Sequence, residues 1–211
     1  MDNSFLTVSG RAEATLIEKK SRFIGYVNTA ACEAEAQDFL NEIRAAHRAA
    51  THNCYAWQIG AQDQFQRSGD DGEPAGTAGR PILEAIKTAG LKNTVVVVTR
   101  YFGGILLGTG GLVRAYSASA RAAIAAAGIV RCQPASLYAL TAEYSDWQRL
   151  TNFLQAGGYQ QQDAVFRDKI DVQILVPDDQ TERFTNGLTD LLGAAACPLL
   201  LDNSAVMQTP L

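Results

Sequence analysis

The chain has 211 residues, enough for one large domain or two small ones, and its 47% hydrophobic and 19% charged residues are typical of a globular protein. No uninterrupted apolar stretch of about 18 residues is present, which excludes a membrane span and a membrane partner. Residues 1–10 show no basic stretch before an apolar core, so no secretory signal is visible. With four widely spaced cysteines and no C-x-x-C, the sequence predicts a cytoplasmic protein with reduced thiols.

Residues 1–133 alternate strand and helix patterns. Strands are expected where apolar and β-branched residues run or alternate, and helices where apolar residues recur at helical spacing. In chain order, the expected elements are strands at 12–18 and 22–29 joined by a basic turn, a helix at 33–47, a strand at 54–60, a helix at 80–89, a strand at 93–99 and a helix at 110–127. The last helix is alanine-rich and ends at Gly128.

Cys132-Gln-Pro134 interrupts this pattern and is expected to be a linker. Beyond it, the expected order is strand 136–144, helix 145–156, strand 159–166, strand 169–177, helix 178–192 and strand 198–203. This βαββαβ order is that of the ferredoxin-like fold. The sequence therefore predicts an α+β protein with two domains, residues 1–133 and 134–211.

Glycine is concentrated around the strand at 93–99. Ten of the 18 glycines fall between Gly69 and Gly111, and nine of these lie in two loops that flank this strand. The second loop leads into the helix at 110–127, and a glycine-rich helix N-terminus lets an anion approach unpaired backbone N–H groups. The expected phosphate-facing residues are Arg22, Arg100, Tyr101, Gly103, Gly104, Thr109, Gly110, Gly111 and Arg114. The alternative is that these glycines serve only a sharp chain reversal and close packing.

Charge is distributed unevenly. Residues 1–133 hold 14 Lys/Arg and 12 Asp/Glu, whereas residues 134–211 hold 4 and 10. No Asp or Glu occurs from Ala85 to Ala142, although six Lys and Arg do. Such a segment is a candidate electropositive face for phosphate or nucleic acid, unless most of it is core.

The first glycine loop carries three carboxylates, on Asp70, Asp71 and Glu73. Together they could hold Mg²⁺ near a phosphate, but such residues more often cap helices or form Asx turns, so no cofactor and no metal site are predicted. His52 and Cys54 lie two residues apart, which strand alternation explains without a metal or thiol site. No catalytic residue is predicted.

A longer pattern surrounds these loops. The segment from Gly79 to Gly108 contains Gly79, Ile82, Leu83, Ile86, Leu91, Val97, Val98, Arg100, Tyr101, Phe102, Gly103, Gly104, Leu107 and Gly108 at characteristic spacings. It is flanked by Lys20-Ser-Arg-Phe-Ile24, by the loop residues Asp70, Asp71, Gly72, Glu73, Pro74, Gly76 and Thr77, and by Gly108-Thr-Gly-Gly-Leu-Val-Arg-Ala-Tyr116. This pattern resembles the signature of the IMPACT (YigZ-like) family, bacterial branch, and the resemblance covers nearly the whole chain.

The resemblance implies an N-terminal domain like the second domain of a small-subunit ribosomal protein. It also implies a ferredoxin-like C-terminal domain similar to the last domain of elongation factor G. Eukaryotic members regulate translation under stress with the help of an extra N-terminal domain. Because this chain begins at the family core, their mechanism is not expected to apply to it.

The resulting hypothesis is a non-enzymatic cytoplasmic binding protein linked to translation, with RNA or the ribosome as partner of the N-terminal domain. One alternative is a kinase-like enzyme that binds nucleotide phosphates at Gly108–Gly111. Another is a protein-interaction module that uses the sheet face or edge of the second domain.

Overall fold

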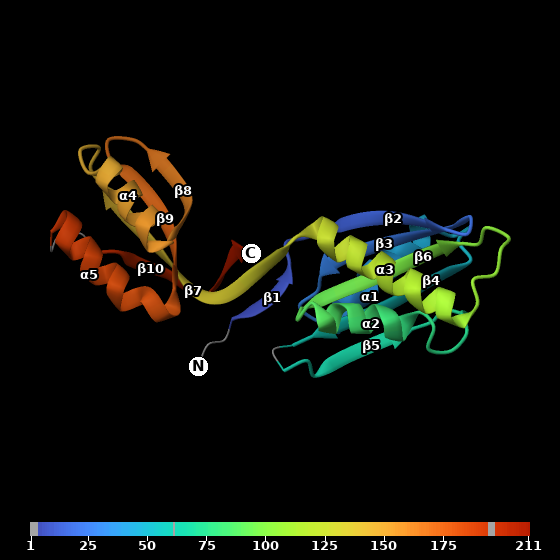
Figure 1. Ribbon diagram of the computed structural model, residues 1–211. Helices are drawn as coiled ribbons and strands as arrows, with labels where there is room; N and C mark the ends of the chain where they lie inside the picture. The colour runs from blue at the N-terminus through green and yellow to red at the C-terminus, as the bar shows by residue number, and fades with distance from the viewer. Residues whose placement is uncertain (1–3, 61, 194–196) are drawn as a thin grey trace. The chain divides into compact units, whose positions relative to one another are not determined.

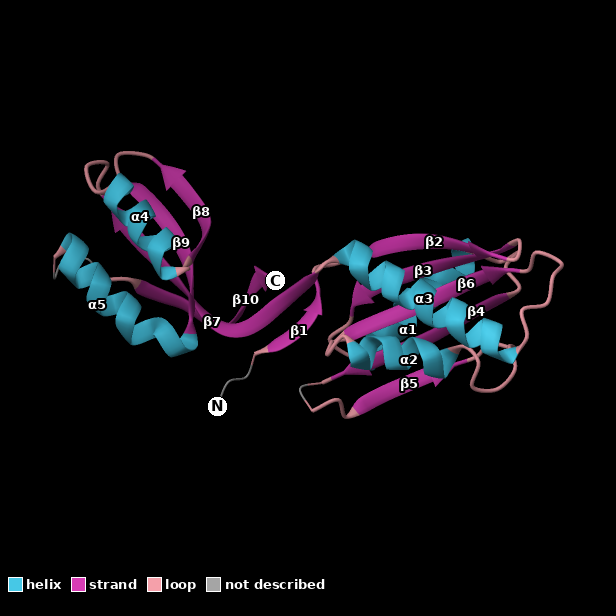
Figure 2. Ribbon diagram, viewed as in Figure 1, coloured by secondary structure: helices cyan, strands magenta, loops and turns pink. Residues whose placement is uncertain are grey.

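Two compact units make up the protein, and both combine a sheet with helices (Figures 1 and 2). The computed structural model describes residues 4–60, 62–193 and 197–211. The N-terminal unit comprises Phe5–Arg131 with Pro210–Leu211, and the C-terminal unit contains Cys132–Thr209. This architecture confirms the predicted α+β class.

The N-terminal unit contains an antiparallel sheet with the strand order β2-β3-β6-β4-β5. The strands are β2 (Ala12–Glu18), β3 (Ser21–Thr29), β4 (His52–Ile59), β5 (Phe65–Gly69) and β6 (Thr94–Tyr101). The middle strand, β6, is formed by the valine run, and Val95 to Val98 are all fully buried. An apolar run of this kind fits a strand that is covered on both faces.

Helices cover both faces of this sheet (Figure 1). On one face, α1 (Glu33–Ala46) packs Phe39, Leu40 and Ile43 onto a core shared with Ile24, Tyr26, Trp57, Val95 and Val97. On the other, α2 (Gly79–Thr88) and α3 (Thr109–Ala127) pack onto Phe23, Val27, Val96 and Val98. Neighbouring residues of a strand therefore face different helices. Among the described residues, no helix has the length and apolar character needed to cross a membrane.

The C-terminal unit has the βαββαβ order expected from the sequence. Its elements are β7 (Ile129–Ala142), α4 (Trp147–Gly157), β8 (Gln160–Phe166), β9 (Ile170–Pro177), a short 3₁₀ turn, α5 (Thr181–Leu192) and β10 (Leu199–Pro210). The strands lie in the order β10-β7-β9-β8. Leu150 and Leu154 of α4, with Phe184 and Leu188 of α5, form a core against β7 and β9. This is the ferredoxin-like arrangement.

Three features of the fold differ from the sequence-based expectations. The prediction of a linker at residues 132–134 is wrong, because these residues lie inside the continuous strand β7. Pro134 is tolerated there because the ladder with β9 begins only at Ala135, so its missing N–H breaks no bond of that ladder. Two strands were not expected: β5, which is short and exposed, and β1 (Phe5–Val8), which pairs with β7.

Candidate functional site

The two glycine-rich loops border one cavity of the N-terminal unit. The first loop connects β5 to α2, and the second connects β6 to α3. The cavity has a volume of 460 Å³, and its lining includes Thr51, His52, Glu73, Arg100, Phe102 and Thr109. We call this cavity the loop pocket.

A buried ion pair forms one wall of the loop pocket. Arg100 is only 5% exposed, and its Nη1 lies 2.5 Å from Oε1 of Glu73, whose side chain is 3% exposed. The same Oε1 accepts a hydrogen bond from the Tyr116 hydroxyl at 2.7 Å. Contrary to the prediction, Arg100 does not belong to an exposed phosphate-facing surface, because its charge is neutralised inside the protein.

Cys54 and Tyr116 stay protonated beside this pair. Burial raises the pKa of both groups well above their ordinary values. The Cys54 thiol donates a hydrogen bond to the carbonyl oxygen of Asp70, with Sγ and O 2.9 Å apart. Because a thiol reacts as its thiolate, Cys54 serves packing and loop structure rather than nucleophilic chemistry.

Asp70 organises the first loop. Its carboxylate accepts backbone N–H groups from Gly76, Ala78 and Gly79 at 2.8, 3.0 and 2.8 Å. Partial burial favours the protonated form, but these three hydrogen bonds outweigh it and lower the pKa of Asp70. Thr77 closes the same loop by donating its hydroxyl to the Pro74 carbonyl at 2.6 Å.

The three carboxylates of this loop point to different protein partners. Asp71 accepts the Asn53 N–H at 2.7 Å and pairs with Arg44 Nη2 at 2.8 Å. Asp70 binds loop backbone and Glu73 binds Arg100, so the three do not converge on a common point. Within the described ranges, no group of three His, Cys, Asp or Glu is placed to hold a metal ion. The residues therefore do not fit the Mg²⁺ ion of the kinase-like alternative.

The second loop contains a glycine whose small size is required. Gly103 donates its N–H to Ser21 Oγ at 3.1 Å, and a Cβ at this position would overlap backbone atoms of Lys20. Gly104 instead has open space around it and a φ of 82°, a conformation that glycine adopts easily. The loop is thus fixed against the turn between β2 and β3.

The N-terminus of α3 lies at the end of the second loop. Gly108 is the N-cap residue, so no side chain caps the helix, and its first turn contains no acidic residue. The described residues supply no hydrogen-bond acceptor to the N–H groups of Thr109, Gly110 and Gly111. These N–H groups form the positive end of a 19-residue helix.

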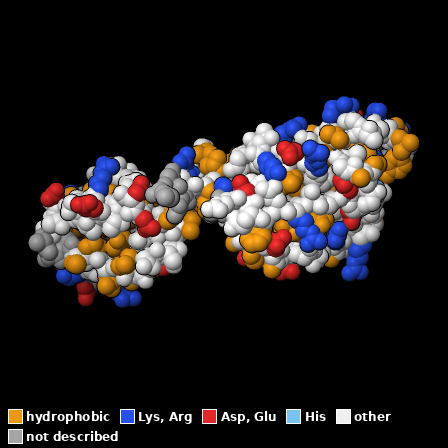
Figure 3. All heavy atoms as spheres, turned by 90° about the horizontal axis from the view of Figure 1, so that it is seen from below, with side chains coloured by type: hydrophobic (Ala, Val, Ile, Leu, Met, Phe, Trp, Pro, Cys, Tyr) orange, Lys and Arg blue, Asp and Glu red, His pale blue; other side chains and the backbone are white. Residues whose placement is uncertain are grey.

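The predicted phosphate-facing residues do not form one surface. Arg22 is exposed and lies over the ring of Tyr101 at 4.5 Å, on the face of the sheet that carries α1. Arg114 is exposed on α3, which covers the opposite face. Thr109, Gly110, Gly111 and Arg114 come together at one helix end, whereas Arg22 and Tyr101 form a separate pair. On the face seen in Figure 3, basic side chains likewise stand in separate groups with acidic ones among them.

His52, for which the sequence predicts no role, lines the loop pocket. Its Nδ1 donates to the carbonyl oxygen of Asp71 at 2.8 Å, and its Nε2 lies 3.8 Å from Glu73 Oε1. His52 is paired with Arg100 across β4 and β6. That cross-strand register brings His52 to the ion pair, and no local motif around His52 indicates it.

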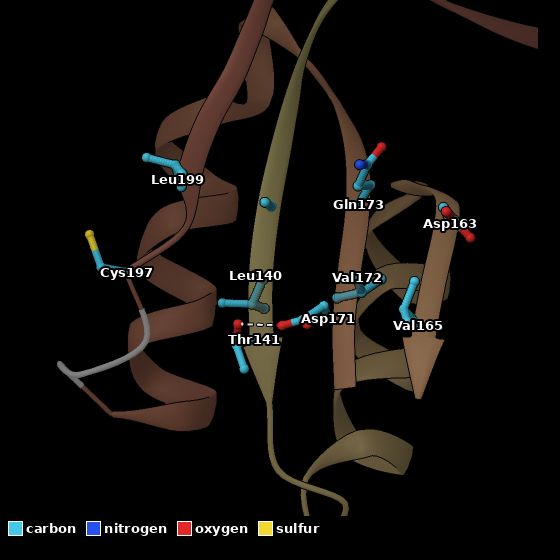
Figure 4. Close-up of a pocket in the computed structure, with 10 residues that line it drawn as sticks. Leu140, Thr141, Asp163, Val165, Asp171, Val172, Gln173, Cys197 and Leu199 are labelled. Carbon is cyan, nitrogen blue, oxygen red and sulfur yellow. Dashed lines mark hydrogen bonds between the residues drawn. The ribbon is translucent and has the colours of Figure 1, made fainter. Parts of the chain in front are cut away.

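The C-terminal unit has a different kind of hollow, on its sheet (Figure 4). It has a volume of 360 Å³ and is lined by residues of β7, β8, β9 and β10 and by Cys197. Asp163 and Asp171 supply carboxylates, with Asp171 accepting a hydrogen bond from Thr141 at 2.7 Å, and no Lys or Arg is among the lining residues. This hollow is unsuited to an anion.

Comparison with known proteins covers both units. The Impact N-terminal domain matches residues 19–124, and a domain of unknown function, DUF1949, matches residues 140–195. IMPACT family member YvyE of Bacillus subtilis (strain 168) is 38% identical over 191 residues, which are 90% of this chain and 88% of that protein. IMPACT family member YigZ of Escherichia coli (strain K12) is 46% identical over 138 residues, 63% and 67% of the two chains.

More distant and structural relatives agree. Protein IMPACT of Rattus norvegicus is 35% identical over 100 residues, covering 45% of this chain and 31% of the relative. A solved structure, described as the crystal structure of a hypothetical protein, aligns with a TM-score of 0.62 at 32% identity, covering 97% of this chain and all of the other. Both domain matches and the near full-length relative lead to one conclusion: the chain belongs to the IMPACT family.

Proposed function

We propose that this protein is a non-enzymatic cytoplasmic binding protein linked to translation, which contacts RNA or the ribosome through its N-terminal unit. Membership of a family whose eukaryotic members regulate translation supports the link. The observation that carries the proposal is the conformation of the turn between β2 and β3, where two lysines occupy positions that are unfavourable for lysine.

Lys19 and Lys20 form this two-residue turn, closed by the pair Glu18 and Ser21. Their φ angles are 45° and 66°, in the left-handed region that two-residue hairpins fill with Asn-Gly. A side chain with a Cβ costs about 1–2 kcal/mol in that region. Both lysines are exposed, and no carboxylate of the described residues pairs with them. Strain of this kind, held at an exposed charged turn, indicates a role for the charge.

A third cation lies close to the turn. Lys19 and Arg114 line one groove of 310 Å³ together with Glu18, with apolar side chains of β2 and with Leu107. Arg114 forms no ion pair with any described carboxylate. Lysine and arginine without internal partners are the groups that neutralise nucleic-acid phosphates. Residues 134–211, with 4 Lys/Arg and 10 Asp/Glu, would repel RNA, so the contacts are assigned to the N-terminal unit.

The test is the salt dependence of affinity for a fluorescent single-stranded RNA. Each neutralised phosphate contributes about 0.7 to the slope of log K against log salt, so a Lys19→Gln/Lys20→Gln variant should flatten the slope by about 1.4. Arg67→Gln/Lys87→Gln removes the same charge from exposed residues outside the groove and serves as the control. An equal change in both variants would mean that net charge alone matters, and the assignment of the turn would be wrong.

A second candidate function, protein interaction, is favoured by the edge strand of the C-terminal sheet. Among the strands that the structure describes, β10 pairs only with β7, and its residues Leu199, Leu200 and Leu201 are 65%, 48% and 46% exposed. Exposed apolar side chains on an unpaired strand edge are typical of strand addition by a partner. A partner that is retained after nuclease treatment and lost from a Leu199→Lys/Leu201→Lys variant would support this function. A partner released by nuclease would favour RNA instead.

A further inference from the structure

One end of the loop pocket offers hydrogen-bond acceptors. Oε1 of Glu73 is occupied by Arg100 and Tyr116, whereas no described residue donates a hydrogen bond to Oε2. His52 Nδ1 carries a hydrogen, because it faces the carbonyl oxygen of Asp71, so Nε2 of the neutral ring is an acceptor. Oε2 is open to the pocket, where it can accept a hydrogen bond from a donor such as an amine.

The other end offers donors. Gly108 and Thr109 line the pocket where the free N–H groups of the α3 N-terminus begin. Nη1 of Arg114 lies 3.6 Å from the position that a Cβ on Gly110 would occupy, which places a guanidinium beside those N–H groups. Several N–H donors and one cation match a phosphate, which carries three terminal oxygens, better than a carboxylate.

An apolar wall connects the two ends. Phe102 and Leu106 are 45% and 81% exposed, and Leu107 and Leu112 complete the wall. The guanidinium of Arg100 lies 5.4 Å from the Phe102 ring. A volume of 460 Å³ is within the usual range of small-molecule sites, which are mostly apolar with a few placed polar groups. An exposed aromatic ring on such a wall is suited to stacking with a flat ligand.

From these three features we infer that the loop pocket binds a mononucleotide. The phosphate monoester lies at the N-terminus of α3, the base lies against Phe102 and Leu106, and an N–H group of the base donates to Glu73 Oε2 or His52 Nε2. Arg114 lines the groove ascribed to RNA and is shared by the two proposals, whereas the lysine turn is not part of the loop pocket, so a loss of RNA binding and a loss of nucleotide binding can be told apart in the lysine variant. The same chemistry is offered by a free nucleotide and by the 5′-phosphorylated end of an RNA.

The experiment follows backbone amide signals of the ¹⁵N-labelled full chain by NMR. AMP should shift the signals of Thr109, Gly110 and Gly111 in a saturable way, and adenosine and inorganic phosphate should each bind about tenfold more weakly. Oligoadenylates with a 5′-phosphate or a 5′-hydroxyl distinguish the two sources. If the phosphorylated oligonucleotide binds more tightly than AMP, the site takes an RNA end, and if AMP binds more tightly, it takes a free nucleotide.

Thr109→Asp separates binding from folding. A carboxylate in the first turn of a helix favours the helix, yet it repels a bound anion, so the fold should be kept while AMP binds about tenfold more weakly. Ala125→Asp places the same charge on the same helix about 24 Å away and should leave the affinity unchanged. His52→Ala should weaken AMP binding and leave binding of inorganic phosphate unchanged.

Four results would overturn the inference. These are the absence of saturable shifts with millimolar AMP, equal affinities for AMP and adenosine, equal affinities for AMP and inorganic phosphate, and an unchanged affinity in Thr109→Asp. Equal affinities for AMP and adenosine would mean that the site does not bind the phosphate, and equal affinities for AMP and inorganic phosphate would mean that it does not bind the base.

Discussion

The ion pair between Glu73 and Arg100 gives the sharpest test of the site's construction. In Arg100→Met, the carboxylate of Glu73, whose side chain is 3% exposed, loses its arginine and keeps the Tyr116 hydroxyl at 2.7 Å and His52 Nε2 at 3.8 Å. Removing one partner of a buried pair costs about 3–5 kcal/mol, because the remaining charge is left without compensation. Arg22→Met removes an exposed guanidinium from the ring of Tyr101 and should cost only about 0.5–1 kcal/mol.

Urea unfolding measures both changes. Trp57 is fully buried in the N-terminal unit, so its fluorescence reports on this unit in a Trp147→Phe background that silences the tryptophan of α4. Adding Glu73→Gln to Arg100→Met removes the orphaned charge and should recover much of the lost stability. If Arg100→Met loses less than about 1 kcal/mol and instead weakens RNA binding, then Arg100 faces solvent and the internal pairing described here is wrong.

Three further substitutions should change the stability of the protein or its RNA affinity in a stated direction. Lys19→Asn/Lys20→Gly should relieve the left-handed strain of the turn and raise the free energy of unfolding by about 1 kcal/mol, while RNA affinity at low salt falls. A gain in stability with unchanged RNA affinity would refute the role of the turn. Asp70→Asn should destabilise the protein at neutral pH, because the folded-state pKa of Asp70 is lowered. The stabilisation by Asp70 is present above its unfolded-state pKa and disappears as the pH falls through the folded-state pKa. The unfolding curves of the two proteins should therefore converge in acid. Gly103→Ala should lower the melting temperature more than Gly104→Ala, since only the Cβ at residue 103 meets backbone atoms, and the reverse order would contradict the packing of the second loop.

Most of the architecture could be predicted because it depends on local patterns. The valine run at Val95–Val98 has no polar face and so indicates a strand covered on both sides, as found. The alanine-rich segment before Gly128 forms α3, the longest helix of the described chain. By contrast, β5 could not be recognised, because Phe65 is its one large apolar residue and pairing with β4 creates the strand.

The site was harder to predict because its partners are distant in sequence. Arg100 comes directly after the strand predicted at 93–99, which suggests a side chain that leaves the sheet toward solvent, whereas it lies within β6. Its partner Glu73 is 27 positions away in the sequence, so the two side chains meet only in the folded protein. The separation of Arg22 from Arg114 is simpler, since strand alternation puts Arg22 and Phe23 on opposite faces, and Phe23 packs with α3.

The turn formed by Lys19 and Lys20, whose backbone is left-handed, could not be predicted because the sequence contains no local signal for it. Lys-Lys has no preference for a two-residue hairpin, and contacts with the second glycine loop hold the turn in place. Ser21 Oγ accepts the Gly103 N–H at 3.1 Å and faces Arg100 Nη2 at 3.5 Å, and Gly103 packs directly on the Lys20 backbone. The strained turn is therefore anchored to this loop and, through Arg100, to the buried pair with Glu73. The absence of a side chain at Gly103 lets the second loop approach the Lys20 backbone closely enough for the turn and the loop that leads into α3 to be held together.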